Sequence, residues 1–144
     1  MRIMGLDLGQ KRIGVALSDP MLLTATAHTV IPRRGLAEDI HRICALVEEY
    51  DVGEIVVGLP VRTTGEEGPE AALARGFAER LAEQCSQVKV SFFDERFTTV
   101  IAERVLIEGN VRRKKRREVI DQLAAAVMLQ NYLDYRKKGR ESSE

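Results

Sequence analysis

The chain has 144 residues, the length of one ordinary domain, which argues against a multi-domain enzyme. Hydrophobic residues make up 44% and charged residues 31%, a globular balance that excludes extensive disorder and fibrous repeats. The net charge is zero, but residues 111–144 hold 10 lysines and arginines against 5 acidic residues, while residues 1–110 hold 12 against 17. We expect a cytoplasmic protein, because no apolar run approaches the roughly 18 residues of a membrane span and Asp7 interrupts the segment where a signal peptide would be apolar.

The first third of the chain predicts three strands followed by a helix. Short apolar runs at residues 2–8, 13–18 and 24–31 are typical of strands, and the polar segment 9–12 predicts a hairpin turn between the first two. The period then changes to that of an amphipathic helix of about four turns. Its apolar positions are Leu36, Ile40, Ile43, Cys44 and Val47.

Strands and helices alternate in the rest of the chain. The continuous apolar run 54–60 predicts a parallel strand covered on both faces, and residues 88–93 predict another. Helices are predicted around Leu73, Phe77 and Leu81, over about residues 99–108, and over about residues 117–137 with the stripe Ile120, Leu123, Ala124 and Val127.

This order, βββαβαβα, predicts an α/β fold with a mixed five-stranded sheet: three antiparallel strands, then two parallel ones, flanked by helices. We predict a single domain over residues 1–138 and a flexible polar tail over residues 139–144. The two cysteines, Cys44 and Cys85, do not have the spacing of a zinc site, and we predict reduced thiols that pack against helices.

Three carboxylates occupy positions that are costly without a function. Asp7 lies inside an apolar strand, where an unpaired charge is unfavourable. A second apolar strand ends in Asp94 and Glu95, whose side chains alternate, so we favour Glu95 for a shared site; an ordinary solvated strand end is the alternative. Asp121 shares a helix side with Ala125 and Met128, although a solvated helix aspartate is also compatible with its position.

The predicted topology brings these carboxylates together. Parallel strands end at one edge of the sheet, where open α/β sheets bind their ligands, and the last helix can lean over that edge. A site of carboxylates without histidine or cysteine suits Mg²⁺ or Mn²⁺. Two such ions would activate a water and stabilise the displacement of a phosphodiester. We therefore predict that Asp7, Glu95 and Asp121 are catalytic residues and metal ligands.

Basic residues near this edge predict a polyanionic substrate. Lys11 and Arg12 lie in the first turn, and Arg96 follows the acidic pair. A run of six basic residues would attract phosphate without reading bases, since no aromatic residue accompanies it. The run consists of Arg112, Arg113, Lys114, Lys115, Arg116 and Arg117.

Four motifs in order resemble the YqgF family over residues 2 to about 135. They are Gly5-Leu6-Asp7-Leu8-Gly9 with Lys11-Arg12-Ile13-Gly14-Val15-Ala16, then Val56-Val57-Gly58-Leu59-Pro60, then Asp94-Glu95-Arg96 with Thr98-Thr99, and finally Asp121 with Ala124-Ala125. The resemblance implies an RNase H-like fold and a metal-dependent nuclease that processes pre-16S rRNA in ribosome biogenesis. It places the motif acids at Asp7, Glu95 and Asp121 and leaves the role of Asp94 open.

Other functions remain compatible with these motifs. A Holliday junction resolvase would need a dimer that places two sites on opposite strands, whereas a non-catalytic nucleic-acid-binding module would bind independently of Asp7. The sequence does not decide between a monomer and a homodimer. The segment 5–9 also resembles a phosphate motif of two-domain sugar-kinase-like ATPases, but 144 residues provide only one such domain.

Overall fold

The structure is a computed structural model that describes residues 1–95 and 123–137. Seven elements occupy the first range, and residues 123–137 form a further helix. The bounds are β1 Arg2–Leu8, β2 Arg12–Ser18, β3 Ala25–Pro32, α1 Leu36–Glu49, β4 Val52–Leu59, α2 Pro69–Gln84 and β5 Lys89–Asp94. The predicted helix at 99–108, the start of the predicted last helix and the predicted tail at 139–144 lie outside the described residues.

The five strands form one mixed sheet in the order β3-β2-β1-β4-β5. β1 pairs antiparallel with β2, and β2 pairs antiparallel with β3. β4 pairs parallel with β1 and with β5, so β4 lies between the strand that carries Asp7 and the strand that ends in Asp94. This arrangement confirms the predicted fold class.

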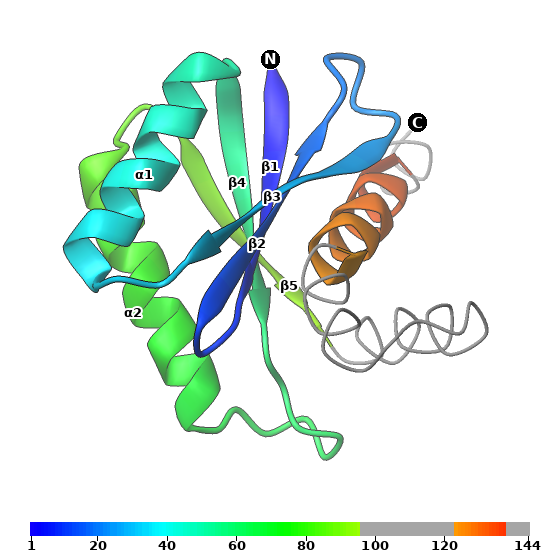
Figure 1. The fold of residues 1–144 in the computed structure, drawn as a ribbon. Helices are drawn as coiled ribbons and strands as arrows, with labels where there is room; N and C mark the ends of the chain where they lie inside the picture. Colours follow the sequence, from blue (N-terminus) through cyan, green and yellow to red (C-terminus); the bar gives the residue numbers. More distant parts are fainter. Residues whose placement is uncertain (96–122, 138–144) are drawn as a thin grey trace, which may run out of the picture.

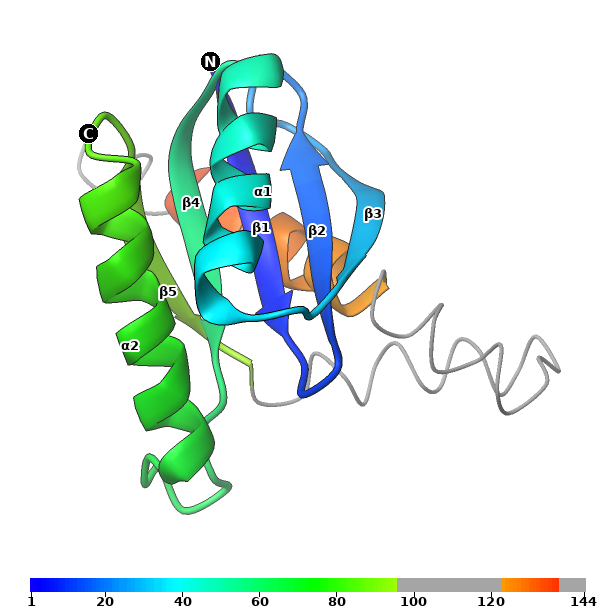
Figure 2. The ribbon, with the colours of Figure 1, turned by 60° about the vertical axis from the view of Figure 1, so that its left-hand side comes forward.

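Helices cover both faces of the sheet. In Figures 1 and 2, α1 and α2 lie on one face, and the helix 123–137 lies on the other. The two faces carry separate cores because successive side chains of a strand point to opposite sides. Ile55 and Val57 of β4 belong to the core under α1 and α2, whereas Val56 packs with Ala125 and Leu129. β4 is therefore covered on both faces, as its apolar run predicts. No helix in the described part of the chain is long and apolar enough to cross a membrane.

Two predicted helix stripes need correction. Leu73 is 75% exposed, and α2 instead buries Ala71, Ala74, Phe77, Ala78 and Leu81. In the helix 123–137, Val127 is only half-buried, and the buried stripe is Ala124, Ala125, Met128, Leu129 and Leu133. Small alanines are buried in both helices because they allow close approach to the sheet, and of these the predicted stripes named only Ala124.

The prediction of two reduced cysteines is wrong in this structure, which contains a Cys44–Cys85 disulfide. Cys44 lies on α1, and Cys85 follows the last turn of α2. The helices lie side by side on one face, and the two Cα atoms are 6.1 Å apart, within the range that a disulfide spans. A separation of 41 residues in sequence gives no sign of this approach.

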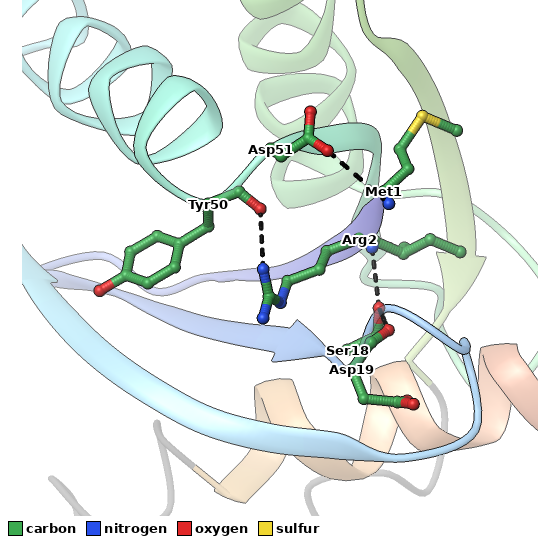
Figure 3. Close-up of polar contacts among 7 residues, drawn as sticks. Met1, Arg2, Ser18, Asp19, Tyr50 and Asp51 are labelled. Carbon is green, nitrogen blue, oxygen red and sulfur yellow. Dashed lines mark hydrogen bonds and ion pairs between the residues drawn. The ribbon is translucent and has the colours of Figure 1, made fainter.

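Polar contacts anchor the start of β1, at the end of the strand away from Asp7. Figure 3 shows the Arg2 side chain, which donates a 3.2 Å hydrogen bond to the carbonyl of Tyr50 just after α1. The amino group of Met1 lies 3.7 Å from the carboxylate of Asp51. The Ser18 hydroxyl accepts the N–H of Ile3 at 2.8 Å. These contacts tie β1 to the segment before β4 and to the end of β2.

Candidate active site

Asp7 is placed by the alternation of β1. Leu6 packs into the core under α1 and α2. On the other face, a Cβ added to Gly5 would lie 3.0 Å from the Cβ of Leu129, so Gly5 faces the helix 123–137. Asp7, two residues further, shares the face of Gly5. Its half-buried carboxylate therefore lies on the side of the sheet that this helix covers, near the carboxyl end of β1.

Glu95 reaches the same face from the far side of β4. Its N–H donates a 3.1 Å hydrogen bond to the carbonyl of Leu59, which keeps the chain beside β4 after β5 has ended. Its side chain then lies over Gly58. A Cβ built on Gly58 would be 2.1 Å from Oε1 of Glu95 and 2.5 Å from its Cδ. Only glycine leaves room for this crossing.

The two carboxyl groups meet and form a hydrogen bond. Burial, then the hydrogen bond to Asp7 and the negative charges of Asp7 and Asp94, together raise the pKa of Glu95 to about 10. Two carboxyl groups in contact share a proton because both cannot carry a charge without a compensating cation. The sequence predicted this pairing of Asp7 and Glu95, and the structure brings the two residues together.

This pair fits a hard divalent cation. It offers carboxylate oxygens only, which are the donors that Mg²⁺ and Mn²⁺ prefer, and a bound cation would favour the charged form of Glu95, whose pKa burial raises. Within residues 1–95 and 123–137, no three acidic, histidine or cysteine side chains gather closely enough to hold a metal ion. The third predicted ligand, Asp121, lies outside the described residues.

Of the predicted cationic residues, the structure describes Lys11 and Arg12. Lys11, which is exposed, lies in the turn that joins β1 to β2, and Arg12, which is half-buried, is the first residue of β2. The turn is closed by the N–H of Gly9, which donates to the carbonyl of Arg12 at 2.8 Å. The structure does not describe Arg96 or the basic run 112–117.

Sequence reasoning missed the role of Gly58. The residue stands in a strand that otherwise consists of large apolar residues near its end, and an isolated glycine in such a strand signals close approach of another group. That signal was present in the sequence. What approaches could not be read from it, because the strand order that places β4 between β1 and β5 comes from tertiary structure.

Relatives of known sequence resemble the chain over nearly its whole length. A protein of Moorella thermoacetica named "Putative pre-16S rRNA nuclease" is 54% identical over 93% of this chain and 95% of its own length. A protein of Syntrophomonas wolfei with the same name is 47% identical over 98% of this chain and 99% of its own.

Solved structures show the same fold. RuvC of T. thermophilus in complex with a Holliday junction substrate matches with a TM-score of 0.61 over 96% of each chain, at 17% identity. The Holliday junction resolvase of fowlpox virus matches with a TM-score of 0.57 over 94% of this chain and 99% of its own, at 14% identity. At these identities the likeness concerns the fold, and it confirms the predicted RNase H-like class. A family model described as RuvX, Holliday junction resolvase, matches residues 1–135. The match confirms the family resemblance seen in the motifs, and the chain belongs to the RuvX family.

Proposed function

We propose that this protein is a metal-dependent nuclease that hydrolyses phosphodiester bonds, and that its substrate is a precursor of 16S rRNA. The observation that carries the proposal is the contact between Asp7 of β1 and Glu95, which follows β5 and reaches Asp7 over Gly58 of β4. Family membership and full-length relatives named as nucleases of pre-16S rRNA support the reaction and the substrate class.

Asp7, Glu95 and Asp121 would hold Mg²⁺ or Mn²⁺ in this proposal. The bound ion supplies a more acidic water and stabilises the charge that develops on the phosphodiester. The helix predicted from the sequence over about residues 117–137 groups Asp121 with Ala125 and Met128, and both of the latter are fully buried in the structure. That burial supports the assignment of Asp121 to the same side as Asp7.

Basic residues would hold the nucleic acid near the carboxylates. Lys11 in the β1–β2 turn would contact phosphate close to Asp7, with Arg12 and Arg96 beside it, and the run 112–117 would attract the polyanion. Such contacts position a nucleic acid without specifying its sequence. We propose that the protein works in the cytoplasm, where ribosomal RNA is matured.

A four-way DNA junction is the second candidate substrate. The family model is described as a Holliday junction resolvase, and the matched RuvC structure contains a junction. Cutting a junction symmetrically needs two sites, so this candidate also requires a dimer at the working concentration. The third candidate is a nucleic-acid-binding module that does not cleave.

The decisive experiment measures cleavage of an end-labelled 16S rRNA precursor and of a labelled four-way junction, each with Mn²⁺, Mg²⁺ or EDTA. We expect metal-dependent cleavage of the RNA by the wild-type protein. Asp7→Asn should lower the cleavage rate at least about 100-fold and retain binding, because it removes a metal-binding charge with little change in size.

Asp51→Asn is the matched control, since Asp51 is an exposed aspartate at the other end of β1. This variant should cleave like the wild type. Full activity of Asp7→Asn would refute the assignment of the site. Cleavage of the junction alone would favour the resolvase, and RNA binding without cleavage of either substrate would favour the binding module.

A further inference from the structure

Arg33 contacts the turn that carries Lys11 at two points. The residue follows the end of β3, and its backbone N–H donates a 2.9 Å hydrogen bond to the carbonyl of Lys11. Its Nη1 donates a second hydrogen bond, also 2.9 Å, to the carbonyl of Gly9. Since the N–H of Gly9 also donates to the carbonyl of Arg12, three hydrogen bonds restrain the segment from Gly9 to Arg12.

The guanidinium of Arg33 is itself held in place. Its Nε lies 3.6 Å from Oδ2 of Asp39, which is 1% exposed in the first turn of α1. Oδ1 of Asp39 accepts the N–H of Arg34 at 3.0 Å, whereas Oδ2 has no hydrogen-bond partner and depends on the charge of Arg33. The ring of Phe77 from α2 lies 5.6 Å below the guanidinium carbon. Two helices, α1 and α2, thus hold this side chain in place.

These contacts exceed what the stability of the fold requires. The carbonyl of Gly9 lies in a half-exposed turn, where water could satisfy it at little cost. Arg33 nevertheless binds this carbonyl, and the buried carboxylate of Asp39 and the ring of Phe77 hold its guanidinium there. A fixed turn matters for Lys11, because its exposed side chain would otherwise sample many positions relative to Asp7.

We propose that Arg33 is a positioning residue: with Asp39 it holds the β1–β2 turn so that Lys11 meets the phosphate backbone of the substrate beside Asp7. The inference deepens the proposed function and rests on it. Arg33 acts through the main chain of the turn and does not touch the substrate.

The test is a double-mutant cycle of Arg33→Gln and Lys11→Gln, measured as kcat and KM for cleavage of the labelled rRNA precursor with Mn²⁺. We expect Arg33→Gln to raise KM roughly tenfold with kcat changed less than about twofold, because a substrate contact is lost while the carboxylates stay in place. In the Lys11→Gln background, Arg33→Gln should change KM less than about twofold, because the contact that it positions is already absent.

Arg34→Gln is the matched control. It removes the same charge one residue away, from a side chain that is 63% exposed and pairs with Glu38 at 3.8 Å. Its KM should stay within about twofold of the wild-type value. Equal KM values for Arg33→Gln and Arg34→Gln would overturn the proposal. A tenfold effect of Arg33→Gln that persists in the Lys11→Gln background would also overturn it, since Arg33 would then bind substrate directly.

Amide hydrogen exchange of residues 9–12 provides a readout that needs no substrate. Exchange should be faster in Arg33→Gln and unchanged in Arg34→Gln. If Arg33→Gln fails to fold, Arg33→Lys keeps a charge beside Asp39 but loses the forked geometry, and it should show a smaller rise of both exchange and KM. If Arg33→Gln shows faster exchange but the KM of the wild type, the positioning role of Arg33 is overturned and the proposed nuclease function is not affected. A wild-type protein that neither binds nor cleaves the RNA overturns the proposed function and the role of Lys11 with it.

Discussion

At the scale of single residues, the candidate site depends on a glycine, Gly58. Gly58 has no Cβ, and the carboxyl group of Glu95 occupies the space where one would stand. Because β4 lies between β5 and β1, the side chain of Glu95 must cross β4 to reach Asp7. The absence of one methyl group therefore decides whether the two carboxylates meet.

Gly58→Ala should abolish most of the activity without unfolding the protein. The new methyl group would lie 2.1 Å from Oε1 of Glu95, so the carboxyl group must move by an ångström or more, and such a displacement costs about 100-fold in rate. Rates of metal-dependent cleavage and thermal unfolding check this. Gly76→Ala on α2 is the control, because a Cβ at this position would meet nothing within 4 Å. It should keep full activity, and its free energy of unfolding should rise by up to about 1 kcal/mol. Normal cleavage by Gly58→Ala would show that Glu95 does not need this path.

Glu95→Gln should stabilise the metal-free protein at alkaline pH. The pKa of Glu95 is raised to about 10 in the folded protein from an ordinary 4.5. Between these two values the folded protein keeps the proton of Glu95 and the unfolded chain releases it, so a rising pH favours unfolding. The stability that the protonated Glu95 contributes is therefore complete below about pH 4.5 and is lost as the pH rises toward 10. Relative to the variant, the wild type should lose roughly 1–3 kcal/mol between pH 5 and pH 9, in urea unfolding with EDTA present.

The exposed Glu66 supplies the control for this measurement. Glu66→Gln should follow the wild-type pH dependence within about 0.5 kcal/mol. The assignment fails if Glu95→Gln and the wild type show the same pH dependence, because the carboxyl group of Glu95 would then not be held in its neutral form.

At the scale of elements, a partly buried polar contact fixes the helix 123–137 onto the sheet. The hydroxyl of Tyr132 donates a hydrogen bond to Glu54, which is 7% exposed on β4. The hydroxyl of Ser91 on β5 donates to the same oxygen at 3.2 Å. Burial, and then the hydrogen bond and charge of Glu54, raise the pKa of Tyr132, so the phenol remains a donor. Gln130 adds a 2.9 Å hydrogen bond from the N–H of Ala25.

Tyr132→Phe should destabilise the protein by about 1–3 kcal/mol, because it leaves the buried carboxylate of Glu54 with one fewer donor. Tyr135→Phe removes the same hydroxyl from a side chain that is 71% exposed on the same helix, and it should change stability by less than about 0.5 kcal/mol. Urea unfolding of both variants measures the difference. Equal stabilities would mean that the Tyr132–Glu54 contact contributes nothing to the docking of this helix.

At the scale of the whole molecule, the disulfide joins two helices that share one face of the sheet. Closing a loop of 41 residues restricts the unfolded chain and stabilises the fold by about 4 kcal/mol in the chain-entropy estimate. A reductant should therefore lower the Tm by roughly 10 °C. The double variant Cys44→Ala/Cys85→Ala should show no such shift, and a wild-type Tm unaffected by reductant would show that the bond does not form in solution.

The sequence by itself determined the strands, the helices α1 and α2 and the family, and it predicted the acidic pair of the candidate site. Periods of two and 3.6 are local properties, and a carboxylate within an apolar strand is conspicuous because burying it is costly. The tertiary structure alone decided three other features: the crossing of Glu95 over Gly58, the clamp of Arg33 on the β1–β2 turn, and the Cys44–Cys85 bond. Each joins residues that are far apart in the chain, and their approach depends on strand order and helix packing, which no local pattern records.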